Sequence, residues 1–155
     1  MKPALLLISL VTASSLAWAV DTLQLGDIMP NVTLQDQHEK PATIDAQTQR
    51  IIFAADNTGA SMVTAFLDSQ APSWLKDTRT TYLADIHKMP GFVTRMFALP
   101  QLREKPYTII LGREEADLAM MPRQKGCITI SQLKEQKITT LDFACNEEDF
   151  QRKMK

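Results

Sequence analysis

Two cysteines, Cys127 and Cys145, have the most versatile chemistry in this chain. A reactive thiolate needs a helix N-terminus or a nearby cation to lower its pKa, and neither cysteine falls at the turn between the first central strand, residues 51–56, and the helix after it. They are also too far apart in sequence for a catalytic Cys-x-x-Cys pair. Three interpretations stay open: a structural disulfide, free thiols, or a redox-active pair. We predict the disulfide, which would stabilise the fold by about 3 kcal/mol in the chain-entropy model.

A His-x-Met pair, His87 and Met89, is the best candidate for metal binding, because imidazole and thioether ligands suit copper. The other histidine, His38, is remote in sequence, and two scattered histidines make a poor ligand set. We therefore expect no metal or other cofactor, with His87 in a loop and Met89 packed. Four further methionines stand in apolar segments and are expected to pack in the core: Met62, Met96, Met120 and Met121.

The composition argues against several classes of partner and of enzyme. The formal net charge is −1, so no basic field is large enough to attract nucleic acid or a membrane surface. Gly59-Ala60-Ser61 lacks the second glycine of a nucleophile elbow, and the five glycines form no phosphate-binding loop. We predict no catalytic residue, which leaves the two cysteines as the one route to an enzyme.

The first residues have the pattern of a secretory signal peptide. Lys2 gives a positive start, residues 4–11 are predominantly apolar, and the small residues Ala17 and Ala19 flank Trp18. The apolar run is shorter than the roughly 20 residues that a membrane-spanning helix needs. We predict that residues 1–19 are removed and that residues 20–155 form a single domain in the periplasm or the medium, where disulfides persist.

The hydrophobic pattern alternates between strands and helices, which is typical of an α/β fold with parallel strands at its centre. The remaining segments indicate added antiparallel strands and a final helix capped by Asn146. The expected elements are a strand or hairpin at 23–34, strands at 51–56 and 80–86, helices from Met62 and over 91–102 with Phe92, Met96 and Leu99 on one face, a hairpin of 107–111 with 118–122, helical turns at 131–136 and an edge strand at 138–144.

Two stretches resemble the thioredoxin superfamily, and within it the exported peroxiredoxin-like and TlpA-like branch. The segment LGDIMPNVTLQDQ has Gly26, Pro30 and Asp36 in the order of that branch's Gly-x-x-x-Pro motif, strand and Asp-containing turn. Residues 80–111 follow the superfamily's order of strand, helix, loop and a cis-proline that starts the next strand, a role that the resemblance gives to Pro106. The resemblance implies a three-layer fold with a central mixed sheet flanked by helices.

The reactive cysteines of that superfamily are absent, since their place reads Asn57-Thr58-Gly59-Ala60 here. The resemblance implies a groove for an extended peptide, which would bind as an added strand beside the cis-proline. Its residues would be Asp56, Asn57, Thr58, Lys105 and Pro106. The alternative is that the turn serves only turn formation and helix capping. Arg95 and Arg103 would add charge-assisted contacts to a partner or would face water.

We therefore expect an exported thioredoxin-like protein without thiol-disulfide catalysis, which binds another exported protein or an extended peptide. Two alternatives stay open. One is a weak periplasmic oxidoreductase that uses Cys127 and Cys145, and the other is a copper accessory protein that uses His87 and Met89.

Overall fold

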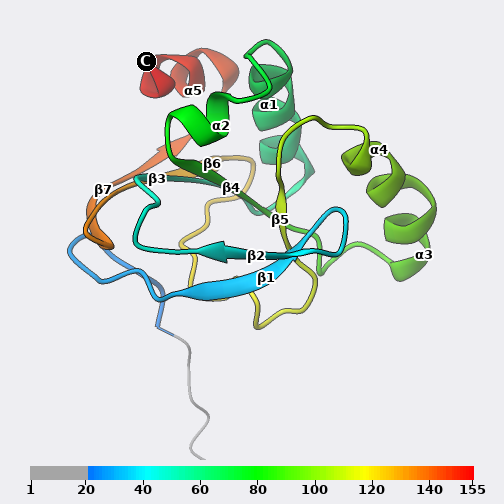
Figure 1. The fold of residues 1–155 in the computed structure, drawn as a ribbon, viewed down its shortest axis with the longest axis horizontal. Coiled ribbons are helices and arrows are strands. Elements are labelled where there is room, and N and C mark those ends of the chain that lie inside the picture. Colours follow the sequence, from blue (N-terminus) through cyan, green and yellow to red (C-terminus); the bar gives the residue numbers. More distant parts are fainter. Residues whose placement is uncertain (1–20) are drawn as a thin grey trace, which may run out of the picture.

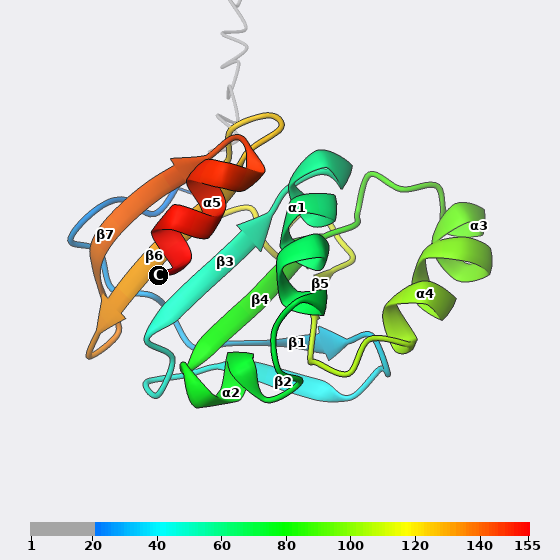
Figure 2. The same ribbon diagram turned by 90° about the horizontal axis from the view of Figure 1, so that it is seen from above.

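The computed structural model describes residues 21–155, and the predicted signal peptide lies outside this range. A seven-stranded mixed sheet has the order β2-β1-β5-β4-β3-β6-β7 (Figures 1 and 2). Its strands are β1 (Val32–Asp36), β2 (Pro41–Ile44), β3 (Arg50–Ala54), β4 (Thr80–Asp85), β5 (Ile110–Gly112), β6 (Ile128–Lys134) and β7 (Lys137–Ala144). The helices are α1 (Asn57–Asp68), α2 (Trp74–Asp77), α3 (Gly91–Val93), the π-helical turn η1 (Thr94–Ala98), α4 (Leu99–Arg103) and α5 (Glu147–Met154). Within the described range, every helix lacks the length and apolar character needed to cross a bilayer.

The β3-α1-β4 unit forms the centre of the sheet, as the sequence predicts. β3 is almost entirely buried, which explains its continuous apolar run. β4 pairs with it in parallel, from Arg50 opposite Thr80 to Ala54 opposite Ala84. The carboxyl ends of both strands therefore meet at one edge of the sheet, where Asp56 follows β3 and Asp85 ends β4.

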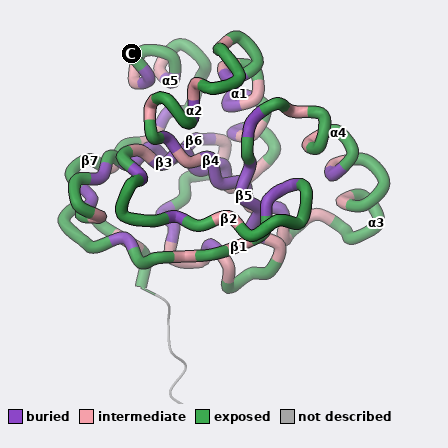
Figure 3. The backbone as a smooth tube through the Cα atoms, viewed as in Figure 1, coloured by how far each residue is buried: buried purple, intermediate pink, exposed green. Residues whose placement is uncertain are grey.

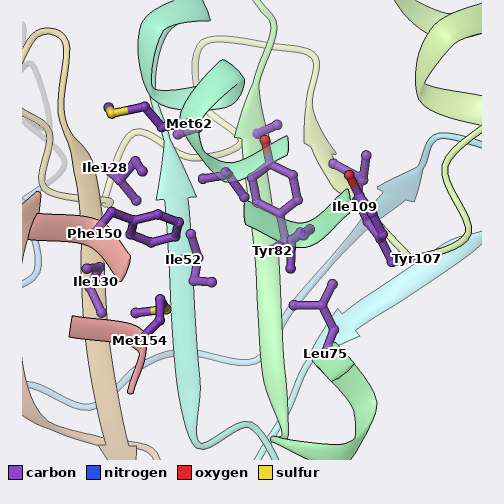
Figure 4. Packing of buried hydrophobic residues seen from close by; sticks show 14 of the residues in the cluster. Ile52, Met62, Leu75, Tyr82, Tyr107, Ile109, Ile128, Ile130, Phe150 and Met154 are labelled. Atoms are coloured by element: carbon purple, nitrogen blue, oxygen red, sulfur yellow. The ribbon is translucent and has the colours of Figure 1, made fainter. Parts of the chain in front are cut away.

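Buried side chains form one cluster on each face of the sheet. Helices α1, α2 and α5 gather on one face (Figure 2), where Met62 and Phe150 pack near Ile52 (Figure 4). On the other face, Phe53 and Leu83 pack with residues of the N-terminal segment and of the loop after β5. The α/β fold with a central mixed sheet flanked by helices is thus confirmed.

The C-terminal part confirms two predictions and corrects one. β7 is an edge strand, and Asn146 caps α5 by accepting a hydrogen bond from the Asp149 N–H at 2.9 Å. The helical turns predicted at 131–136 are wrong, because residues 131–134 belong to β6 and a turn with positive φ follows. Ser131 lies between Ile51 and Leu141 of the neighbouring strands, so pairing on both sides overrides the local preference of this segment.

The predicted hairpin of 107–111 with 118–122 is also wrong. β5 pairs with β4 in parallel and with β1 in antiparallel orientation. Both of its edges are therefore occupied, and residues 118–122 form turns in place of a strand. The N-terminal hairpin exists, but its second strand is β2, which lies further along the chain than the predicted segment.

The helical segment of residues 91–103 stands at the side of the sheet, and its residues are mostly exposed (Figure 3). Pro100 has no N–H to offer the Met96 carbonyl, and the Leu99 N–H instead reaches the Thr94 carbonyl five residues back. Leu99 is buried, but Phe92 and Met96 are 65% and 59% exposed. The prediction of a core face with Phe92 and Met96, and of core packing for Met96, is therefore wrong.

The other methionines that were predicted to lie in the core differ in how far they are buried. Met62 and Met121 are buried, which confirms their predicted packing in the core, and Met120 is partly buried against the second cluster.

Candidate functional site

The turn between β3 and α1 is organised by the side chain of Asp56. This residue caps α1: its Oδ1 accepts a hydrogen bond from the Gly59 N–H at 3.0 Å. Its Oδ2 accepts another from the Gly126 N–H at 2.7 Å, which ties the loop before β6 to the start of the helix. Gly59 permits this close packing, because a Cβ there would lie 3.1 Å from the Cys127 carbonyl oxygen.

The charge of Asp56 is stabilised where it lies. Burial alone would raise the pKa of this carboxyl group, but the backbone N–H groups of Gly59 and Gly126, with the charge of Lys125, lower it below the ordinary Asp value. An ionised carboxylate thus occupies the positive end of α1, where a neighbouring thiolate would otherwise gain its stability. Asn57 and Thr58 beside it are exposed.

The structure divides the predicted peptide groove between two places. Asp56, Asn57 and Thr58 lie at the start of α1, whereas the Lys105 Nζ lies 2.6 Å from Oδ2 of Asp68, the last residue of that helix. β5 runs parallel to β4, so the chain just before β5 lies at the edge of the sheet where β4 begins. The five residues therefore do not form one surface.

The assignment of Pro106 as a cis-proline is wrong as well. Residues 21–155 contain no cis peptide bond, so the bond from Lys105 to Pro106 is trans. The segment that lies beside the start of α1 is Gly126-Cys127, which precedes the strand antiparallel to β3.

Lys105 takes part in an internal network at the far end of α1. The Asp68 carboxylate accepts hydrogen bonds from the Lys105 Nζ and from the Tyr107 hydroxyl at 3.0 Å. The hydrogen bond from Lys105 lowers the pKa of Asp68. Burial, followed by the bond to Asp68, raises the pKa of Tyr107 above its ordinary value. These contacts give Lys105 a structural role.

The predicted disulfide between Cys127 and Cys145 is present. Ile128 pairs with Ala144, so the disulfide joins the two strands just beyond the last pair of the β6-β7 ladder. Cys127 is buried and Cys145 is exposed. Because the Cys127 carbonyl packs against Gly59, the disulfide lies next to the first turn of α1.

An exposed apolar surface lies on the helical segment of residues 91–103. We define the apolar surface as four residues whose exposed fractions are 65%, 38%, 59% and 57%: Phe92, Val93, Met96 and Phe97. The Phe92 and Phe97 rings meet edge to face with centroids 6.1 Å apart. Val93 also lines a cavity of about 350 Å³ with Asp56 and Asn57, so the apolar surface is continuous with the turn at the start of α1.

A cavity of about 420 Å³ separates α1 from the helical segment. Asn57, Ala60 and Ser61 line it from the side of α1, and Ala98 and Leu102 line it from the other side. Concave spaces with mostly apolar walls and a few polar groups are the usual form of ligand sites. The turn, this cavity and the apolar surface thus form one candidate binding region.

His87 is fixed by Asp85. Its Nδ1 lies 2.5 Å from Oδ1 of Asp85, whose other oxygen accepts a hydrogen bond from Arg123 at 2.8 Å. His87 and Met89 line one cavity. Within residues 21–155, no group of three or more His, Cys, Asp or Glu side chains is arranged to hold a metal ion.

Asp85, Gly126 and Arg123 were not predicted as site residues. Asp85 follows a buried run at the carboxyl end of a parallel strand, which is where open α/β sheets place functional groups, and this signal was available. The roles of Gly126 and Arg123 depend on a loop between the predicted segments 118–122 and 131–136, for which the sequence pattern predicts no element, so no local signal identified them.

Comparisons with known proteins identify the fold. No protein-family model matches the chain, and a search of curated proteins found no match. Among solved structures, the thioredoxin domain of a thiol-disulfide oxidoreductase from Bacteroides vulgatus is 13% identical, with a TM-score of 0.54 over 86% of this chain and 99% of that chain. A peroxiredoxin-like protein from Aquifex aeolicus is 12% identical, with a TM-score of 0.55 over 87% and 88% of the two chains.

A thio-disulfide isomerase from Thermus thermophilus is 14% identical, with a TM-score of 0.50 over 85% of this chain and 95% of that chain. Identities this low carry information about the fold and none about the activity. Together with the mixed sheet and the position of α1 after the central strand, they show that residues 21–155 have the thioredoxin-like α/β fold.

Proposed function

We propose that this protein is an exported, thioredoxin-like binding protein, which holds a segment of another exported protein without exchanging disulfides with it. The observation that carries the proposal is the apolar surface, on which two phenylalanines, a valine and a methionine face solvent on one short helical segment. Monomeric proteins seldom expose contiguous apolar side chains without a use for them, and such patches mark interaction sites.

The turn at the start of α1 supports a role without thiol chemistry. The chain has two cysteines, and neither stands at this turn. The Asp56 carboxylate accepts hydrogen bonds from the Gly59 N–H of α1 and from the Gly126 N–H, so an anion already occupies the helix N-terminus and a second one is not favoured there. The exposed Asn57 and Thr58 add hydrogen-bonding groups beside the apolar surface.

The test is site-specific photo-crosslinking in the native host. A photoreactive phenylalanine analogue replaces Phe97 at the apolar surface or, as the control, the exposed Gln151 on α5. We expect one discrete adduct from position 97 and none from position 151. The partner, identified by mass spectrometry and purified, should then bind the Phe92→Ser/Phe97→Ser variant more weakly than the wild type. Equal adducts from both positions, or equal affinities, would contradict the proposal.

Export is part of the same proposal, supported by the signal-peptide pattern of residues 1–19. The intact mass of the protein from the cell envelope fraction should correspond to a chain that begins at Val20. A mass that includes the first residues would refute export by signal cleavage.

A second candidate function is a weak oxidoreductase, favoured by the position of the disulfide. Cys145 is exposed, and its partner Cys127 lies beside the first turn of α1. In this mechanism the thiolate of a partner dithiol would attack the Cys145 sulfur and form a mixed disulfide, releasing the Cys127 thiolate. The partner's second thiol would then displace Cys145, leaving two reduced cysteines here and an oxidised partner.

Alkylation in glutathione buffers of defined ratio separates the two candidates. The binding proposal expects both cysteines to stay blocked at the potentials of an oxidising compartment, as structural disulfides do. Reversible opening at those potentials would favour the oxidoreductase.

A further inference from the structure

A small cavity beneath the helical segment has an unusual collection of charges. It has a volume of about 190 Å³ and lies between the loop after β4, the segment of residues 91–103 and the residue after β5. Its charged or ionisable lining residues are His87, Arg95 and Arg113, and no carboxylate lines it. Its apolar walls include Ile86, Met89 and Leu99.

The two arginines have few partners of their own. Neither forms a salt bridge within residues 21–155. One Arg113 nitrogen donates to the Asp36 carbonyl at 3.4 Å, which is a long contact, and its Nε is buried with no hydrogen-bond partner. A buried guanidinium N–H without an acceptor is costly, so protein acceptors leave much of the donor capacity of Arg113 unused.

His87 also lines this cavity, and its ring is already oriented. Asp85 accepts the Nδ1–H of the ring, so Nε2 faces other partners and donates to a carboxylate only when the ring carries a second proton. The charge of Asp85 is in turn met by Arg123. The Asp85 carboxylate is therefore already paired. The cavity remains a site of positive charge in a chain whose overall net charge is −1.

We propose that this cavity binds a carboxylate that is attached to a short apolar group. The planar guanidinium fork matches the two oxygens of a carboxylate, and the apolar walls suit a few methylene groups. Such a ligand has two sources: the C-terminal carboxyl group of a partner chain, or a free small carboxylic acid. The first source rests on the proposed function, because Gly91, Thr94 and Arg95 join the cavity to the apolar surface. The second source does not depend on it.

The test titrates the isotopically labelled protein with sodium hexanoate and with hexanamide, its uncharged counterpart, while NMR follows the His87 ring and the arginine Nε–H signals. We expect hexanoate to bind about tenfold or more tightly than hexanamide, because charge-assisted hydrogen bonds are lost with the amide. Equal binding of the two compounds, or no binding of hexanoate at millimolar concentration, would overturn the proposal.

Substitutions of the two arginines test whether their charges bind the carboxylate. Arg95→Gln and Arg113→Gln should each weaken hexanoate binding by about tenfold. Arg79→Gln is the matched control, since Arg79 is exposed and lies outside the cavity. Arg95 is also exposed, so its variant tests the site even if the Arg113 variant folds poorly. A loss in the control as large as that in Arg95→Gln would mean that diffuse charge explains the binding, and it would overturn the proposal.

The two sources are separated by a peptide. Acetyl-Gly-Ser-Gly-Leu with a free carboxyl end should displace hexanoate, and its carboxamide should not, if a partner's C-terminus is the ligand. Binding of hexanoate without displacement by the peptide would assign the site to free small acids. Hexanoate binding that persists in Phe92→Ser/Phe97→Ser, together with unchanged partner binding in that variant, would refute the proposed function and leave the cavity proposal standing.

Discussion

At the scale of single residues, Asp56 determines what the start of α1 can do. One carboxylate caps the helix and also holds the loop before β6 through the Gly126 N–H. In a thiol enzyme of this fold, the resemblance places a reactive cysteine at this turn, where the helix favours its thiolate. Here the helix end stabilises an aspartate that also joins two segments of the fold. Asp56, at the positive end of α1, therefore has a structural role.

Removal of this carboxylate should destabilise the protein in a pH-dependent way. We expect Asp56→Ala to lower the free energy of unfolding at neutral pH by about 1–3 kcal/mol, through the lost cap and the lost bond to Gly126. Because the folded-state pKa of Asp56 is lowered, its contribution is present above the unfolded pKa of about 3.9 and is lost as the pH falls through the lower folded pKa. Urea unfolding at a series of pH values measures both effects.

Glu115→Ala is the control for this measurement, since Glu115 is exposed and also acidic. It should change stability by no more than about 0.5 kcal/mol. If Asp56→Ala loses no more free energy of unfolding than the control, or if its loss does not shrink in acid, the hydrogen bonds of Asp56 to Gly59 and Gly126 do not stabilise the fold.

At the scale of elements, the disulfide closes the end of the β6-β7 hairpin. We expect the double variant Cys127→Ala/Cys145→Ala to be less stable by about 3 kcal/mol, as the chain-entropy model gives for a loop of this size. Thermal unfolding of the variant, compared with the wild type with and without strong reductant, measures this. A variant as stable as the oxidised wild type would mean that the disulfide has no structural role, and would favour the redox candidate.

The helical segment of residues 91–103 offers a contrast between exposed and buried positions. Phe92→Ser/Phe97→Ser changes two exposed side chains and should alter the free energy of unfolding by no more than about 1 kcal/mol. Leu99→Ala removes a buried side chain from the same segment and should cost about 2–5 kcal/mol. Chemical denaturation of both variants measures these changes in the free energy of unfolding. A large loss from the phenylalanine variant would show that the apolar surface supports the fold and is not free for a partner.

The sequence predicted those elements whose pattern matches their environment. The continuous apolar run of β3 predicts a buried strand, and β3 is buried in the structure. Asn146 has the residue type of a helix cap, and it caps α5. The segment of residues 131–136 has helix-forming residues, but residues 131–134 lie between two strands, and one of these, β3, is distant in sequence. Phe92 and Met96 have helical spacing, which a core face and an exposed docking face share. Periodicity alone does not distinguish these two faces.

The candidate site was predictable in part. Asp56, Asn57 and Thr58 follow the central strand, so their position at the edge of the sheet follows from the order of elements. Lys105 and Pro106 were misplaced, because their position depends on whether the next strand runs parallel or antiparallel to β4, and the sequence pattern does not specify that direction. The Gly126-Cys127 segment takes the place beside the turn for the same reason.

At the scale of the whole molecule, a thioredoxin-like sheet and its first helix are retained, while the two cysteines lie on the hairpin beside them. Three features gather on the side of the molecule near the carboxyl ends of β3 and β4: the turn at Asp56, the apolar surface and the cavity with His87, Arg95 and Arg113. All three suit recognition of another molecule, and none of them places a thiol at the helix N-terminus. These features favour a protein that binds a partner without disulfide exchange.

The reduction of insulin by dithiothreitol, followed as turbidity with and without the protein, shows whether the protein exchanges disulfides. Thioredoxin-type enzymes accelerate this reaction through thiol-disulfide exchange. We predict that the wild type leaves the uncatalysed rate unchanged, as does Cys127→Ala/Cys145→Ala. Acceleration by the wild type that disappears in the double variant would contradict the claim and identify the protein as an oxidoreductase.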